Sequence, residues 1–156
     1  MDSGLIDVTE GGSIRIDING HWSYNGQKII NHLVIRAFYN ALDRDGQGRY
    51  RIIMDQEICY IEVEDTPFIV SAIRGDNKTG VSLILNNGME EIDLDPSKLW
   101  VENSNILYAG LDKGQKARFS RPAYYNLALM MEEDSQGRVI LDIAGKAFPI
   151  CMKAEQ

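Results

Sequence analysis

The sequence has few cysteines and histidines and no cluster of positive charge. It contains two cysteines and two histidines. Its 23 acidic residues outnumber its 16 lysines and arginines, which gives a formal net charge of -7. Binding to a nucleic-acid backbone depends on clustered Lys and Arg, so no nucleic-acid partner is expected. Cys59 and Cys151 are too far apart for a zinc-type spacing, and free thiols are typical of a reducing cytoplasm.

Long apolar runs and familiar catalytic motifs are also missing. No run approaches the ~20 residues that span a bilayer, and the acidic start, 1–7, lacks the apolar core of a signal peptide. A Gly-x-Ser-x-Gly elbow, a phosphate loop and a dinucleotide glycine fingerprint are absent. The sequence therefore predicts a cytoplasmic protein without membrane contact, with no evident cofactor and no assigned metal, and better suited to binding than to catalysis.

What the sequence does contain is a series of short strands joined by tight turns. Ile14, Ile16 and Ile18 alternate with polar residues, and the Asn19-Gly20 dipeptide that follows is typical of a two-residue hairpin turn. Similar patterns recur to the end of the chain, and strands outnumber helices. The predicted fold class is α+β with antiparallel sheets.

Two helices interrupt this strand-rich sequence. One is predicted near 31–42 with Asn31 as its N-cap, and the second near 121–133 with Ser120 as its N-cap. A polar, glycine-containing segment between the two helices is the best candidate for a boundary between two lobes. We therefore expect two small β-rich lobes that each carry one helix, the first formed by residues 1–75 and the second by residues 76–156.

Similar short segments flank both helices. Gly26-Gln27-Lys28 precedes the first helix and Gly114-Gln115-Lys116 precedes the second. Asp45-Gly46-Gln47-Gly48-Arg49 follows the first helix, and Asp134-Ser135-Gln136-Gly137-Arg138 follows the second. One interpretation is that the same turn chemistry arose twice. The other is an internal duplication, with a ligand groove or contact surface between the halves.

Three motifs resemble a known bacterial family. They are Asn19-Gly20-x-Trp22-x-Tyr24-x-Gly26, Val63-Glu64-Asp65-Thr66-Pro67-Phe68 and Arg121-Pro122-Ala123-Tyr124-Tyr125. Together they are similar to number 1285 of the domains of unknown function. The resemblance implies a small intracellular protein of two β-rich lobes, each with a helix. It implies no chemistry, because that family brings no catalytic residues with it.

The densest cluster of candidate functional residues lies around the second of these motifs. In a continuous strand, Tyr60, Glu62 and Glu64 share one face, with the two glutamates about 7 Å apart and Asp65 next in sequence. Such a cluster could bind a divalent metal through oxygen or supply an acid/base pair. The alternative is a solvated sheet face.

Arg121 is the best candidate for an anion contact, because backbone N–H groups at a helix N-terminus favour negative charge. An exposed arginine paired with an acid is the alternative. The complete set of candidate binding residues is Trp22, Tyr24, Glu62, Glu64, Asp65, Arg121 and Tyr124.

Two functions compete. The first is a small-ligand or protein-binding module, regulatory or adaptor-like, that uses the cleft between the lobes; the missing catalytic motifs favour it. The second is a metal-dependent enzyme with oxygen ligands from Glu62, Glu64 and Asp65. The largely apolar second helix further predicts packing between the lobes or in a homodimer interface.

Overall fold

The computed structural model describes residues 13–102 and 105–153, so the acidic opening segment lies outside the described residues. The chain separates into two compact units, Met1–Pro67 and Phe68–Gln156, and each has a hydrophobic core of its own. The α+β class is confirmed. The division falls before the boundary expected at 75–76, because strand β8 (Phe68–Asp76) runs through that boundary and pairs within the second unit.

The first unit contains seven strands and one helix among its described residues. Its elements are β1 (Ile14–Ile16), β2 (Trp22–Tyr24), β3 (Gln27–Lys28), α1 (His32–Ala41), β4 (Leu42–Arg44), β5 (Tyr50–Met54), β6 (Glu57–Tyr60) and β7 (Glu62–Val63). One sheet has the strand order β3-β2-β1-β7, with β7 parallel to β1. The other is the antiparallel meander β4-β5-β6.

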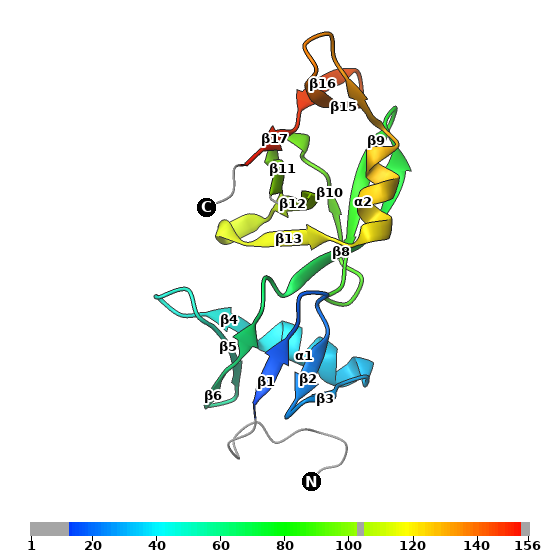
Figure 1. The fold of residues 1–156 in the computed structure, drawn as a ribbon. Helices are drawn as coiled ribbons and strands as arrows, with labels where there is room; N and C mark the ends of the chain where they lie inside the picture. Colours follow the sequence, from blue (N-terminus) through cyan, green and yellow to red (C-terminus); the bar gives the residue numbers. More distant parts are fainter. Residues whose placement is uncertain (1–12, 103–104, 154–156) are drawn as a thin grey trace. The chain divides into compact units, whose positions relative to one another are not determined.

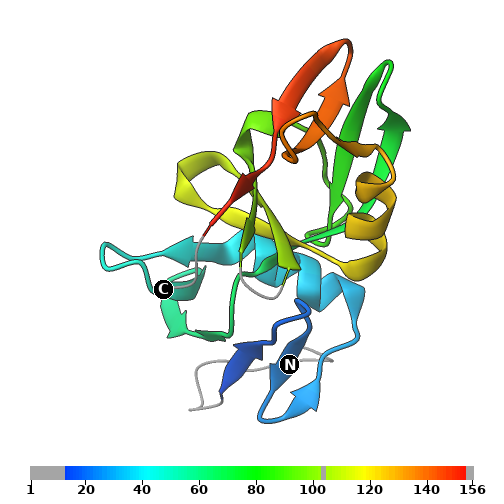
Figure 2. The ribbon, with the colours of Figure 1, turned by 45° about the horizontal axis from the view of Figure 1, so that its top comes forward.

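The second unit begins with β8 and continues to the end of the described chain. Its further elements are β9 (Gly80–Leu85), β10 (Glu91–Asp93), η1 (Pro96–Lys98), β11 (Leu99–Glu102), β12 (Ile106–Gly110), η3 (Asp112–Gly114), β13 (Lys116–Phe119), α2 (Arg121–Ala128), β14 (Met131–Glu133), β15 (Val139–Ile143), β16 (Lys146–Pro149) and β17 (Cys151–Met152). A seven-stranded sheet has the order β10-β9-β8-β13-β12-β11-β17, and β14-β15-β16 form a meander. In Figures 1 and 2 the β15–β16 hairpin lies beside the β8–β9 hairpin, and Ala144 N donates to Asn77 O.

Both helices begin at the predicted caps. The Asn31 side chain accepts hydrogen bonds from the N–H groups of Leu33 and Val34, and the Ser120 hydroxyl accepts one from Ala123. The expected end of the second helix is wrong: α2 stops at Ala128, and Met131 begins β14. A continuous apolar run does not by itself distinguish helix from strand. Here the run contributes its first residues to α2 and its last to β14.

Three hairpin turns are built in the same way around an aspartate. The carboxylates of Asp17, Asp45 and Asp134 each accept hydrogen bonds from the backbone N–H groups two and four residues later. A glycine follows three residues after each aspartate with φ between 80° and 84°, a backbone conformation that favours glycine. The turn at Asn19-Gly20 is therefore a longer loop closed by Asp17, and not the two-residue turn expected from the dipeptide.

The two units share one order of elements. In the first unit three strands, a helix, a three-stranded meander and a short final strand follow one another, and in the second unit β11 to β17 repeat this order. The strand order β3-β2-β1-β7 has its counterpart in β13-β12-β11-β17, with the final strand parallel to its neighbour in both. The second unit adds β8, β9 and β10 beyond β13.

Candidate functional site

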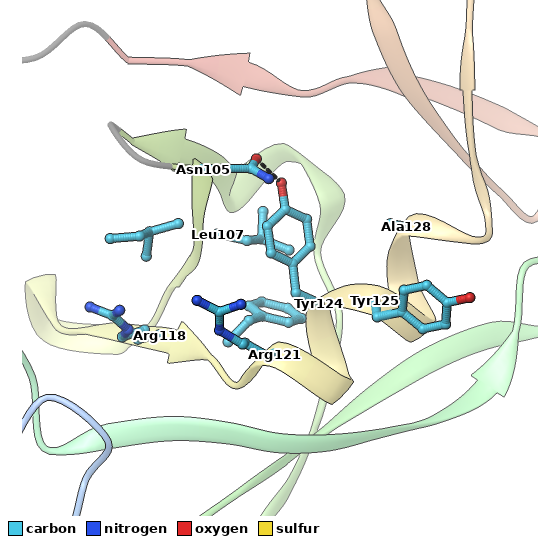
Figure 3. Close-up of a pocket in the computed structure, with 9 residues that line it drawn as sticks. Asn105, Leu107, Arg118, Arg121, Tyr124, Tyr125 and Ala128 are labelled. Carbon is cyan, nitrogen blue, oxygen red and sulfur yellow. Dashed lines mark hydrogen bonds between the residues drawn. The ribbon is translucent and has the colours of Figure 1, made fainter.

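A pocket of about 620 Å³ opens in the second unit where α2 meets strands β12 and β13 (Figure 3). This volume is within the range of small-molecule sites. We call it the α2 pocket. Its lining residues are Asn105, Ile106, Leu107, Arg118, Phe119, Arg121, Tyr124, Tyr125 and Ala128.

The polar groups of the α2 pocket come from β13, from α2 and from Asn105, which lies immediately before β12. Arg118 lies near the end of β13, and Arg121 is the first residue of α2. Tyr124 lies three residues further on, so it shares a helix face with Arg121. Figure 3 shows both guanidinium groups on the same side of α2 as the Tyr124 ring.

The Tyr124 side chain is fixed in its direction. Its hydroxyl donates a hydrogen bond of 2.5 Å to Asn105 Oδ1, and burial raises the pKa of Tyr124 above its ordinary value. The phenol therefore stays neutral at pH 7 and retains its proton for donation. Tyr125, the next residue, points away from the other labelled side chains in Figure 3 and is 65% exposed.

The inner wall of the α2 pocket is apolar. Leu107 and Phe119 are buried, and Ile106 and Ala128 are half-buried. Leu107 packs in the same core cluster as Phe119 and Leu127. The site thus combines an apolar wall with positive charge, which suits a ligand that has both an apolar part and an anionic part.

The acidic cluster expected from the sequence is divided in the structure. The strand predicted to be continuous breaks at Ile61: β6, which carries Tyr60, belongs to the β4-β5-β6 meander, whereas β7, which carries Glu62, pairs with β1. Ile61 N donates to Tyr50 O, which closes the meander at this residue. Tyr60 and Glu62 consequently do not lie on one face of one strand.

The carboxylate of Glu64 is already engaged in the fold. Its Oε1 accepts hydrogen bonds of 3.1 Å from both Arg15 Nη2 and the backbone N–H of Ile18. Tyr60 donates to Asp45 Oδ2 at 2.9 Å instead of approaching the glutamates. Within residues 13–102 and 105–153, no group of three or more His, Cys, Asp or Glu residues is placed to hold a metal ion.

The remaining candidates lie in different surroundings. Trp22 is 1% exposed and packs on Phe38 and Tyr39, so it is part of the core of the first unit. Tyr24 lines a smaller pocket of about 220 Å³ near the start of α1. Glu62 is exposed, and Asp65 is half-buried. Among the candidate binding residues, only Arg121 and Tyr124 line the α2 pocket.

Sequence reasoning missed Arg118 and Asn105. In β13, Ala117 and Phe119 are buried while Lys116 and Arg118 alternate with them, so the strand pattern could have shown that Arg118 faces away from the core. Asn105 gave no comparable signal. It has a φ of 63° immediately before β12, and its contact with Tyr124 joins residues that are 19 positions apart.

The second helix exposes more apolar surface than expected. Ala123 and Leu127 are buried in the core of the second unit, whereas Tyr125 and Leu129 are 65% and 69% exposed. A homodimer through this surface stays a prediction. None of the described helices is long and apolar enough to cross a membrane.

Comparisons with known proteins show which solved structures share this fold. No protein-family model matches the chain, and neither does any curated protein. A solved DUF1285 family protein from Silicibacter pomeroyi DSS-3 is 21% identical, with a TM-score of 0.71 over 89% of this chain and 79% of that one. A DUF1285 family protein from Shewanella baltica OS155 is also 21% identical, with a TM-score of 0.59 over 75% of this chain and 91% of that one.

The chain is therefore an α+β protein whose architecture recurs in solved bacterial structures. More particularly, its fold is that of the DUF1285 proteins. The resemblance drawn from the sequence motifs is confirmed by this shared fold.

Proposed function

We propose that this protein is a binding module that takes a small anionic ligand in the α2 pocket. Arg118 and Arg121 supply two guanidinium groups, which bind carboxylates and phosphates through paired hydrogen bonds. The Tyr124 hydroxyl donates its proton to Asn105 Oδ1, which leaves the Asn105 amide N–H groups as neutral donors at the pocket. This positive site belongs to a chain with a net charge of -7, so it is a local exception to the acidic character of the molecule.

One observation favours binding over catalysis. None of the described residues that line the α2 pocket is a carboxylate, histidine, cysteine, serine or threonine. These are the usual general bases and nucleophiles. A site with arginines, one tyrosine and an amide can hold and orient an anion but offers little means to transform it. We therefore infer a regulatory or adaptor role, in which ligand binding is itself the event.

The binding proposal is tested with inorganic phosphate, phenyl phosphate and benzoate as probes, by isothermal titration calorimetry. Arg118→Gln and Arg121→Gln should each weaken binding about tenfold or more, since charge-assisted hydrogen bonds contribute about 1.5–3 kcal/mol. Arg36→Gln is the matched control, because Arg36 is an exposed arginine on α1 and its loss should leave binding unchanged. Absence of binding by all three probes at millimolar concentration contradicts the proposal, as does equal binding by the Arg118 and Arg121 variants.

We also infer that the two units arose by duplication of one supersecondary element. From the helix caps onward, corresponding residues keep a constant offset of 89: Asn31 and Ser120 cap the helices, and Val34 and Phe38 correspond to the buried Ala123 and Leu127. The pairing register of the meanders keeps the same offset. An experimental structure in which the units superpose at this offset is the expected result. Superposition at any other offset would contradict a common origin.

A further inference from the structure

The core of the first unit contains a cluster of three aromatic rings beside its helix. The ring centroid of Trp22 lies 5.4 Å from that of Phe38 and 5.1 Å from that of Tyr39, in an edge arrangement with Tyr39. The Tyr39 hydroxyl donates a 2.7 Å hydrogen bond to the carbonyl of Pro67. The three rings therefore fill the space between α1 and β2.

Strand register identifies the residue that corresponds to Trp22 in the second unit. Trp22 lies opposite Ile16 on β1, and Ile16 lies opposite Val63 on the parallel strand β7. Leu107 lies opposite Val101 on β11, and Val101 lies opposite Met152 on the parallel strand β17. Leu107 thus occupies the position in the second unit that Trp22 occupies in the first.

The helices give the second correspondence. Tyr39 follows Phe38 in α1, and Ala128 follows Leu127 in α2, at the same offset of 89 as the caps. Both Leu107 and Ala128 line the α2 pocket. The pocket therefore lies where the first unit has an indole ring and a phenol ring, and the second unit has an isobutyl group and a methyl group.

The geometry points to Leu107 and Ala128 as the residues that determine ligand selectivity in the α2 pocket, by leaving room for a compact apolar body attached to the anionic group. This inference rests on the proposed anion site and names its ligand class: a small molecule with an aromatic or compact aliphatic body and a carboxylate or phosphate. The anionic group contacts Arg118 and Arg121. The body replaces the two rings that the second unit lacks, against Leu107 and Phe119.

The test compares phenyl phosphate with inorganic phosphate on the full chain, by calorimetry. The wild-type protein should bind phenyl phosphate about tenfold or more tightly, because the ring buries apolar surface on both partners. Ala128→Tyr should keep inorganic phosphate binding within about twofold and lose the preference for the phenyl group. Asn126→Tyr is the matched control, since it adds the same ring at an exposed position of α2 outside the pocket lining and should leave the preference intact.

A second variant at the same position provides a test if Ala128→Tyr does not fold. Ala128→Leu adds a smaller group that helices accept readily, and it should reduce the preference for phenyl phosphate by an intermediate factor. Melting temperature and far-ultraviolet circular dichroism verify that each variant is folded. Equal wild-type affinity for the two probes overturns the inference, and so does an undiminished preference in Ala128→Tyr and Ala128→Leu. If the wild-type protein binds neither probe nor benzoate, the anion site itself is refuted.

Discussion

The two units of this protein share a backbone plan and differ in what occupies it. Each has a capped helix followed by a three-stranded meander, with an aspartate-centred turn at the same place. In the first unit the space beside the helix holds Trp22 and Tyr39; in the second, Leu107 and Ala128 leave the α2 pocket. Helix caps, turns and alternating buried residues are common to both units, while the side chains at these two positions are large in the first unit and small in the second, where they line the α2 pocket.

The units also differ in the polar residues at the positions that line the α2 pocket. Arg121 and Tyr124 of α2 correspond to His32 and Ile35 of α1 at the same offset. By strand register, Arg118 corresponds to Lys28, because Arg118 lies opposite Tyr108 and Lys28 lies opposite Ser23. The basic positions are thus shared in kind, and the Tyr124 hydroxyl is the polar group that stands where the first unit has an aliphatic side chain. Its place beside the cavity supports the binding role proposed for the α2 pocket.

The largest expected effect comes from the equivalent core positions Phe38 and Leu127, which are 2% and 0% exposed. Phe38→Ala should lower the free energy of unfolding by about 3–5 kcal/mol and Leu127→Ala by about 2–5 kcal/mol, because each leaves a cavity in a closed core. Urea denaturation measures both, with Trp22 fluorescence reporting on the first unit and Trp100 fluorescence on the second. Leu33→Ala, at a position 78% exposed, is the control and should cost little. A loss below about 1 kcal/mol at either core position would show that the helices are not equivalent in packing.

Local sequence signals predicted the helix starts and the strand-rich class correctly. The Asn31 and Ser120 caps could be predicted because a cap depends on its own side chain and the next three residues. The break at Ile61 could not, since residues 57–63 alternate as a single strand would, and only pairing with β1 and β5 separates them into two sheets.

The candidate site was predicted only in part. Arg121 and Tyr124 are close in sequence and were found as a helix motif. Arg118 reaches the α2 pocket from β13, and Asn105 from the residue before β12, so their proximity depends on tertiary packing. Trp22 was selected for its chemistry, but its position opposite Ile16 places it in the core.

A smaller difference is expected between the two helix caps. Asn31 Oδ1 accepts hydrogen bonds from two backbone N–H groups of its helix, at 2.9 and 3.2 Å. Ser120 Oγ accepts one from its helix at 3.3 Å and donates one at 3.3 Å to Ser71 O, outside the helix. Asn31→Ala should therefore cost about 1–2 kcal/mol and Ser120→Ala about 0.5–1 kcal/mol in urea denaturation. The glycine variants at the same positions are controls and should cost only a few tenths of a kcal/mol. An equal or reversed order of the two alanine variants would show that the number of capped helix N–H groups does not determine the loss.

The smallest expected effect is a difference in the pH dependence of stability between the two aspartate turns that follow the helices, at Asp45 and Asp134. Hydrogen bonding from the backbone N–H of Arg49 is the main reason that the pKa of Asp45 falls from 3.8 to about 2, with a further contribution from the Tyr60 hydroxyl. The backbone N–H of Arg138 likewise lowers the pKa of Asp134, but Pro149 stands where the first unit has Tyr60, at the offset of 89.

Because the folded-state pKa is lowered, each carboxylate stabilises the fold above its unfolded pKa and loses that contribution as the pH falls through the folded value. For Asp45 the loss should extend from about pH 4 to about pH 2. Asp45→Asn retains an oxygen acceptor for the turn, so it should flatten the pH dependence of unfolding in this range, and by more than Asp134→Asn does. Tyr60→Phe, which removes one hydrogen bond to Asp45, should bring the acid sensitivity of the first turn closer to that of the second. Urea denaturation at a series of pH values measures these slopes, and an unchanged slope in Tyr60→Phe would show that the backbone N–H groups and the Arg49 side chain lower the pKa of Asp45 without Tyr60.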